Sequence, residues 1–402
     1  MAITTCVPEF LRSESDGPPL YIWPNAPDWC VANERADFMM SGLAAGRSES
    51  EIARDYGTRF DVPPAEASAL LQRLQGQIQS RDVADYRGRA EYLELNRLRE
   101  CWFHLTNRCN ARCHHCMFSC SPDRGRQLPP ELAEGLISEA LALGTEVFYF
   151  TGGEPFVYDG IYDLCEQVLN NADAHVVILT NAIGAKSFLD RMEDWDRGRV
   201  HFQISMDGMA QNHDAVRGEG SWDRVRSHTE RITGAGYPAT LAMSVSRQNV
   251  ADMSEVVRMA PELGVHNVHF MCLFTRGEAE ADLFVEPDRI YPELVRAAEV
   301  ADANGVLIDN LEILKSQVFS IPGSRFDLSN AGWESLAIGP GGDVYPSPAL
   351  VGEKDAFCGN ARKGLETVWK DSEQLQQLRE CSLVDCGEYR EDPLGLILGG
   401  GD

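Results

Sequence analysis

The sequence predicts an α/β protein whose central region is built on a parallel sheet. Apolar runs of strand length recur through residues 96–310, and segments with helical spacing of apolar residues lie between them. Repeated strand–helix units of this kind predict parallel strands joined by crossover helices. The predicted strands are residues 102–105, 147–150, 176–179, 201–204, 240–245 and 268–273.

The predicted helices between these strands are recognised by their ends and their apolar stripes. Pro129 and Pro130 begin one helix and Gly144 ends it, because proline fits a first turn and glycine terminates a last one. A second helix follows Asp159 and places Cys165 on its apolar side, so we expect Cys165 to belong to the core. A third apolar stripe consists of Met253, Val256, Val257 and Ala260.

Length and composition limit the class of protein. A chain of 402 residues exceeds one ordinary core, and we expect domains at 1–95, 96–310 and 311–402. The formal charge of -26 disfavours a nucleic-acid partner, because phosphate binding needs clustered Lys and Arg. No apolar run of about 18 residues and no signal peptide is evident. We therefore predict no membrane partner and a cytoplasmic location, where the twelve cysteines favour metal ligation or thiol chemistry over disulfides.

Residues 1–95 are predicted to form a small domain with a strand hairpin and three helices. The segments PPLYIWP and PDWCVA are expected to be strands joined at residues 25–27. Helices are expected at Glu34–Ala44, after Ser48 and at Pro64–Gln79, and Ser48 with Glu51 has the pattern of a capping box. This layout is winged-helix-like, but the excess of Asp and Glu over Lys and Arg disfavours DNA binding.

The stretch CWFHLTNRCNARCHHCMFSC, residues 101–120, carries five of the twelve cysteines. Cys109, Cys113 and Cys116 have the spacing Cys-x3-Cys-x2-Cys on a loop that leaves an apolar strand. Three thiolates can hold three corners of a four-iron, four-sulfur cluster and leave one iron open to a ligand. A zinc site is the alternative, with His114 or His115 as the fourth ligand, and the spacing alone does not decide between the two. Disulfides among cysteines this close on one loop would cross-link little.

The spacing of these cysteines resembles the signature of the radical S-adenosylmethionine (SAM) enzymes. Residues 151–155, TGGEP, are similar to the motif that takes the SAM amino group in this family, which assigns that role to Gly152, Gly153 and Glu154. The resemblance implies a partial (β/α)6 TIM barrel over residues 96–310, with the chemistry at the carboxyl ends of its strands. It also implies contacts with the ribose or the carboxylate of SAM for Thr180, Asn181, Ser205, Asp207 and Arg217.

Ordinary structural roles remain open for the same residues. Ser, Thr, Asn and Asp are the residue types that cap loops and form turns, so the groups after the third and fourth strands fit either role. Arg217 could equally form an exposed salt bridge.

Residues 311–402 are predicted to form a small α+β extension. The segment ESLAIGPGGDVYPSPA is expected to be a hairpin, and it resembles the entry to the SPASM or twitch extension, which binds auxiliary iron-sulfur clusters. Ser347 and either Ser329 or Asn330 stand where two of the expected cysteines would be. We therefore expect at most one auxiliary cluster, for which the candidate ligands are Cys358, Cys381 and Cys386, completed by Cys272, Cys120 or a non-protein ligand. The abrupt ending GLILGGGD suggests a fragment.

The resemblance as a whole implies a radical SAM maturase of peptides. Residues 1–95 look like the leader-recognition domain fused to such enzymes, in which the leader of a ribosomally made precursor peptide adds a strand to the hairpin edge. The implied reaction is reductive cleavage of SAM, with an electron from a donor such as flavodoxin or ferredoxin. The resulting 5'-deoxyadenosyl radical takes hydrogen from the peptide.

The outcome for the peptide is not determined, because cross-linking and epimerisation are both compatible with these residues. Epimerisation needs a thiol hydrogen donor, for which Cys120 and Cys272 are the candidates, although ordinary loop and strand roles fit them as well. Two other functions remain as alternatives. One is a radical SAM enzyme acting on a small molecule in cofactor or tetrapyrrole biosynthesis, and the other is a zinc or iron-sulfur regulator without catalysis.

Overall fold

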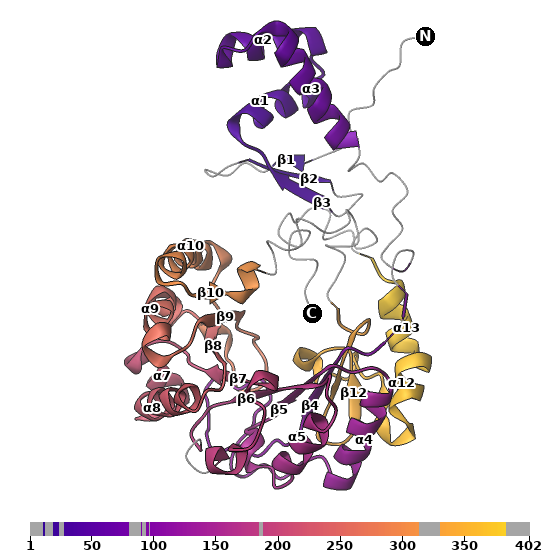
Figure 1. Cartoon of the computed structure of the whole chain (residues 1–402), viewed down its shortest axis with the longest axis vertical. Coiled ribbons are helices and arrows are strands. Elements are labelled where there is room, and N and C mark those ends of the chain that lie inside the picture. The colour runs from indigo at the N-terminus through magenta and orange to yellow at the C-terminus, as the bar shows by residue number, and fades with distance from the viewer. Residues whose placement is uncertain are drawn as a thin grey trace. The chain divides into compact units, whose positions relative to one another are not determined.

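The chain forms two compact units in the computed structural model, which describes residues 11–12, 19–23, 28–79, 90, 94–95, 97–184, 188–312 and 330–382. The described core of the first unit lies within Met1–Glu94, and the second unit comprises Leu95–Lys315 and Asn330–Leu378 (Figure 1). Within the described ranges, no helix is both long enough and apolar enough to cross a membrane.

The first unit combines a small antiparallel sheet with three helices. Its strands are β1 (Leu11–Arg12), β2 (Leu20–Trp23) and β3 (Asp28–Val31), in the order β1-β2-β3, and its helices are α1 (Glu34–Ala44), α2 (Glu49–Phe60) and α3 (Pro64–Gln79). The predicted capping box is confirmed, because Ser48 Oγ accepts from the Glu51 N–H and Glu51 Oε2 accepts from the Ser48 N–H. The two-residue strand β1 is too short for the sequence pattern to predict. The expected turn at residues 25–27 lies outside the described residues.

The second unit is built on a sheet whose central strands run parallel, as the sequence predicts. The order is β10-β9-β8-β7-β6-β5-β4-β11-β12-β13, and each neighbouring pair from β4 to β10 is parallel. All six predicted strands are present: β4 (Glu100–His104), β5 (Val147–Thr151), β6 (His175–Thr180), β7 (Val200–Ser205), β8 (Ala239–Val245) and β9 (Asn267–Cys272). The sheet does not close on itself, so this is a partial barrel.

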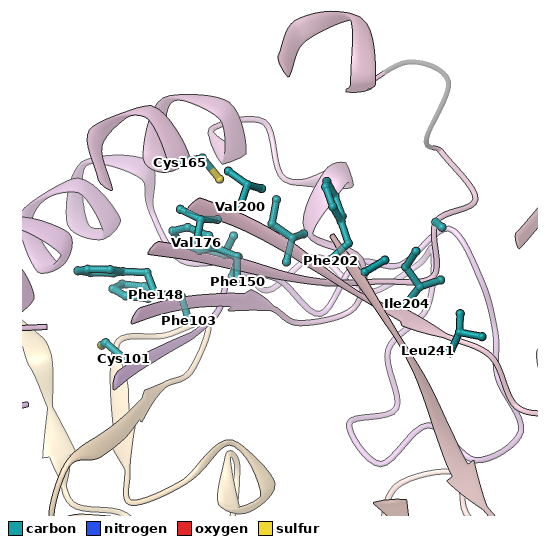
Figure 2. Packing of buried hydrophobic residues seen from close by; sticks show 14 of the residues in the cluster. Cys101, Phe103, Phe148, Phe150, Cys165, Val176, Val200, Phe202, Ile204 and Leu241 are labelled. Carbon is teal, nitrogen blue, oxygen red and sulfur yellow. The ribbon is translucent and has the colours of Figure 1, made fainter. Parts of the chain in front are cut away.

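Helices follow one another around the outer side of this sheet (Figure 1). They are α4 (Pro130–Ala142), α5 (Ile161–Leu169), α7 (Ala210–Arg217), α8 (Ser221–Gly234), α9 (Met253–Met259) and α10 (Pro287–Asn304). Every second residue of each strand faces them, because side chains alternate along a strand. Figure 2 shows this packed layer, in which Phe103, Phe148, Phe150 and Val176 are completely buried. Cys165 is buried in the same cluster, which confirms its predicted core position.

The remaining strands extend the sheet at both edges. The short strand β10 (Leu307–Ile308) pairs with β9. At the other edge, β11 (Ser335–Ile338) runs parallel to β4 and forms the predicted hairpin with β12 (Asp343–Tyr345), which pairs in turn with β13 (Gly359–Asn360). Helices α12 (Leu365–Asp371) and α13 (Glu373–Glu380) follow. The C-terminal extension is therefore continuous with the barrel sheet through the β11–β4 pairing.

Candidate active site

The candidate site lies where strands β4 to β9 end. In a parallel sheet these ends share one edge, so the loops that follow them gather there. A cavity of about 210 Å³ opens at this edge. Among the residues that line it are these predicted site residues: Cys109, Cys113, Cys116, Cys120, Gly152, Gly153, Thr180, Asn181, Ser205, Arg217 and Cys272.

The loop after β4 brings the three spaced cysteines to this cavity. Backbone hydrogen bonds from Cys109 N to Ser121 O (3.1 Å) and from Cys116 N to Cys113 O (3.3 Å) fix its turns. The side chain of Cys109 is buried, and those of Cys113 and Cys116 are partly exposed. Burial raises the pKa of the Cys109 thiol to about 12 and also raises that of Cys113.

Each of the three sulfurs accepts an N–H hydrogen bond. Asn181 Nδ2 donates to Cys109 Sγ at 3.7 Å, and Arg217 Nη1 donates to Cys113 Sγ at 4.0 Å. The backbone N–H of Cys120 donates to Cys116 Sγ at 3.3 Å. The hydrogen bond from the Cys120 thiol is the main reason that the pKa of Cys116 falls to about 6. Each sulfur therefore has an N–H donor beside it, which favours its thiolate form.

The Gly-Gly pair after β5 is packed directly against the cysteine loop. Gly153 N donates to Thr106 O at 2.6 Å. A Cβ atom on Gly152, whose φ is 141°, would lie 2.5 Å from Thr106 O, and one on Gly153 would overlap the carbonyl of Arg108. The glycines are thus required by the close approach of two backbones. The sequence suggested access for a ligand as the reason, and that role at the SAM amino group stays a prediction.

Glu154 ties the end of β5 to the end of β6. Its Oε1 accepts from Thr180 Oγ1 (2.8 Å) and from Phe156 N (3.2 Å), and its Oε2 accepts from Asn181 N (2.9 Å). The residue is only 2% exposed, and burial raises its pKa to about 7. The Glu154 side chain therefore acts as a connector within the protein, and it does not line the cavity.

Asp207, after β7, is the centre of a second buried group. Its carboxylate accepts from Arg217 Nε (2.5 Å), from His115 Nε2 (3.0 Å) and from the Ser244 N–H (2.9 Å). Burial by itself would raise the pKa of Asp207, but the charge of Arg217 and the contact with His115 hold it well below its usual range. These contacts occupy both carboxylate oxygens. Through His115, Asp207 joins the cysteine loop to the barrel.

His213 also belongs to this group, although no sequence motif identifies it. Its Nδ1 accepts from the Asp207 N–H at 3.1 Å, and it lies on α7 four residues before Arg217. Residues four apart share a helix face. That spacing from Arg217 is the signal that could have identified it.

The remaining candidate cysteines are placed differently. Cys120 is buried beside Cys116, and Cys272 is exposed at the end of β9, where it lines the cavity. In the tail, Cys358 is buried and donates to Ala356 O at 3.4 Å, and Cys381 is exposed. Cys386 and Ser329 lie outside the described residues, so the predicted auxiliary ligand set stays a prediction.

Comparison with known proteins assigns a family to this site. Residues 103–260 match the model of the radical SAM superfamily. These residues form a radical SAM domain. The segment that matches contains the three spaced cysteines, the Gly-Gly-Glu motif and the Asp207 group.

The similarity to relatives with assigned roles extends beyond residues 103–260. Mycofactocin maturase MftC of Mycolicibacterium smegmatis is 29% identical over 307 residues, covering 71% of this chain and 74% of that protein. The PqqA peptide cyclase of Ruegeria pomeroyi is 28% identical over 255 residues, covering 61% and 66%. The AdoMet-dependent heme synthase of Methanosarcina barkeri is 24% identical over 294 residues, covering 69% and 83%.

The fold is shared with a solved structure along most of the chain. The crystal structure of Streptococcus suis SuiB bound to precursor peptide SuiA has a TM-score of 0.60, with 15% identity, and covers 92% of this chain and 89% of that one. At this identity the comparison concerns the fold.

The radical SAM family implies a four-iron, four-sulfur cluster and SAM, and the residues at the cavity fit them. Three sulfurs line one cavity and each accepts a hydrogen bond, which suits thiolate ligands of a cluster. Among the described residues, no three His, Cys, Asp or Glu side chains converge closely enough to hold a single metal ion. Cluster ligands do not need to converge in that way, because each thiolate binds a different iron.

Proposed function

We propose that this radical SAM enzyme modifies a ribosomally synthesised precursor peptide. The observation that carries the proposal is the similarity to a peptide cyclase and a maturase, which extends well beyond the radical SAM segment. The fold shared with a structure that contains a precursor peptide supports it.

Cys109, Cys113 and Cys116 would hold the cluster, and SAM would occupy the cavity beside them. When bound, the cluster supplies the electron that cleaves SAM to the 5'-deoxyadenosyl radical. Gly152, Gly153, Thr180, Asn181 and Ser205 line the part of the cavity formed by β5, β6 and β7, where they would contact SAM. The contribution of the chain is to position these groups and to exclude water.

Cys272 is our preferred hydrogen donor if the reaction is an epimerisation. It lines the cavity from β9, across the sheet from the cysteine loop, and its side chain is exposed. Cys120 is the second candidate, but it is buried against Cys116 and its backbone N–H is committed to that sulfur. A donor must reach the substrate carbon, so the exposed thiol fits better.

The first unit would recognise the leader of the precursor. β3 is an edge strand of the described sheet, with β2 on its other side, and Val31 at its end is 56% exposed. An edge strand offers unpaired backbone groups to an added strand. We propose Val31→Asp as a test, with Ser50→Asp, at an exposed position of α2, as its matched control. The first should weaken binding of the precursor about tenfold or more and leave SAM cleavage without peptide unchanged, whereas the control should change neither. Equal affinities would contradict leader recognition at this edge.

The electron would come from a protein such as flavodoxin or ferredoxin. We place the enzyme in the cytoplasm, because reduced thiols are needed to hold the cluster.

Coexpression followed by mass spectrometry tests the proposed reaction. The full-length protein would be coexpressed with each short peptide encoded beside its gene, and Cys113→Ala would serve as the inactive control. Cross-linking should remove hydrogen mass from the peptide. Epimerisation conserves mass in ordinary water but should add deuterium from a solvent-exchanged thiol in heavy water. Unmodified peptides alongside active SAM cleavage would contradict the proposal.

A small-molecule substrate is the second candidate function. The similarity to the AdoMet-dependent heme synthase, which covers 83% of that protein, favours it. In that case Val31→Asp would leave the modification of the substrate unchanged.

A further inference from the structure

The three sulfurs at the cavity accept hydrogen bonds from donors that are themselves fixed. We infer that Arg217 and Asn181 are positioning residues whose N–H groups set the reduction potential of the cluster. Arg217 Nη1 reaches Cys113 Sγ at 4.0 Å and Asn181 Nδ2 reaches Cys109 Sγ at 3.7 Å. The inference rests on the assignment of these cysteines as cluster ligands and is independent of the peptide substrate.

Arg217 is held in place by Asp207 on one side and the cysteine loop on the other. Its Nε donates to Asp207 Oδ2 at 2.5 Å, and its side chain is 13% exposed. The other contact of Asp207 Oδ2 is His115 Nε2, at 3.0 Å, and His115 lies between Cys113 and Cys116 in the sequence. The guanidinium therefore cannot swing away from the sulfur without breaking a buried ion pair.

Asn181 is equally constrained. Its Oδ1 accepts from Ile183 N at 3.0 Å, and its Nδ2 is shared between Asn110 Oδ1 at 2.7 Å and Cys109 Sγ. Its own N–H donates to Glu154. The amide has no unused donor to offer SAM in this arrangement, so its contact with SAM would be a packing contact, and its hydrogen bond to the sulfur is the one that can act on the cluster.

Hydrogen bonds to thiolate ligands stabilise the more negative, reduced state of a cluster. The number of such bonds and the local charge are among the features that set its potential. The third donor, the backbone N–H of Cys120 at 3.3 Å from Cys116 Sγ, does not depend on a side chain. Removal of Arg217 or Asn181 should therefore make the cluster harder to reduce, and the remaining donor should preserve part of the effect.

The alternative is that both residues serve only to bind SAM. The two roles make different predictions for protein that contains the cluster but no SAM. A donor to sulfur changes the midpoint potential of the cluster in the absence of SAM. A role in SAM binding alone weakens SAM binding but leaves the potential unchanged in Asn181→Ala, which removes no charge, and in Arg217→Lys, which keeps the charge. Arg217→Met also removes a charge, which shifts the potential by itself.

The experiment is a redox titration, followed by electron paramagnetic resonance, of the anaerobically reconstituted full-length protein without SAM. The variants are Arg217→Met, Arg217→Lys and Asn181→Ala, each compared at equal iron content. Arg258→Gln is the matched control, because Arg258 is an exposed arginine on α9. SAM affinity would be measured on the same samples.

We expect midpoint potentials more negative than that of the wild type for Arg217→Met and Asn181→Ala, a smaller shift for Arg217→Lys, which keeps the charge, and no shift for Arg258→Gln. Unchanged potentials in Arg217→Lys and Asn181→Ala would overturn the inference, whatever happens to SAM affinity. Failure of all three to assemble a cluster, when Arg258→Gln assembles one, would overturn it in favour of a purely structural role. Absence of a cluster from the wild type would instead refute the ligand assignment. Failure to modify any peptide would leave the inference untouched.

Discussion

The helix-facing side of the barrel sheet and the strand ends are both deeply buried, but they are stabilised in different ways. On the helix-facing side the buried residues are apolar, as with Phe148 and Phe150, which have no exposed surface (Figure 2). Ile178, two residues after Val176 on β6, is also completely buried. At the strand ends the buried residues include Glu154 and Asp207, at 2% and 0% exposure. Apolar packing is spread over many weak contacts, whereas a buried charge depends on a few specific partners. The strand ends should therefore be far less tolerant of substitution.

The two buried carboxylates at the strand ends also differ from each other. Glu154 accepts hydrogen bonds only from neutral donors, and burial raises its pKa to about 7. Asp207 is as deeply buried, but Arg217 and His115 hold its pKa well below its usual range. A charged partner thus decides which carboxylate stays ionised.

The largest expected effect is that of Asp207→Ala. It would leave Arg217 buried without its partner and would free His115, so we expect a loss of about 3–5 kcal/mol in the free energy of unfolding. Anaerobic urea unfolding of the cluster-free protein would measure this. Ile178→Val on the helix-facing side, at equal burial, should cost only about 1 kcal/mol. Similar losses for the two variants would remove the distinction between the two regions.

The fold was largely predictable because its signals are local. Strand β5 is a short apolar run, β7 alternates apolar and polar residues, and α4 begins at a proline and is followed closely by Gly144, so each element carries its own pattern. The three cysteines and the Gly-Gly pair were found for the same reason, since each motif is contiguous.

The partners of the polar site residues could not be predicted in this way. Asp207 meets His115 from a loop more than ninety residues earlier in the chain, and Asn181 meets Cys109 across 72 positions. Such pairs depend on which loops meet at the carboxyl ends of the strands. Patterns in a single sequence do not show which loops meet. The residue types alone were compatible both with SAM binding and with contacts inside the protein.

The second prediction concerns Glu154 and the dependence of stability on pH. A carboxyl whose pKa is raised from 4.5 to about 7 binds its proton more tightly in the folded state. Its contribution to stability is therefore fully present below pH 4.5 and is lost as the pH rises through 7. The shift corresponds to about 3 kcal/mol at roughly 1.4 kcal/mol per pKa unit.

Glu154→Gln removes this titration and provides the measurement. Urea unfolding of cluster-free wild type and variant at several pH values should show the wild type losing up to about 3 kcal/mol relative to the variant as the pH rises through this range. The variant also places an amide NH₂ or a weaker acceptor opposite the Asn181 N–H, which lowers its stability at every pH by a constant amount. A difference between the two proteins that does not change with pH would show that Glu154 is not the buried, neutral carboxyl described here.

The smallest expected effect comes from replacing one glycine in each region, Gly153 at the strand ends and Gly135 in the helix layer. A methyl group on Gly153 would overlap the carbonyl of Arg108 and come within 3.0 Å of Cys109 Cβ, so the cysteine loop must shift. We expect Gly153→Ala to lower the free energy of unfolding by about 1–3 kcal/mol and to reduce iron incorporation, because Cys109 moves with the loop.

Gly135, in the helix layer on α4, has open space where its Cβ would lie. Gly135→Ala should stabilise the protein by about 0.5–1 kcal/mol and leave the iron content unchanged, since alanine favours a helix over glycine. Iron analysis and urea unfolding of the two variants would measure both effects, and full iron incorporation by Gly153→Ala would show that the loop tolerates the displacement.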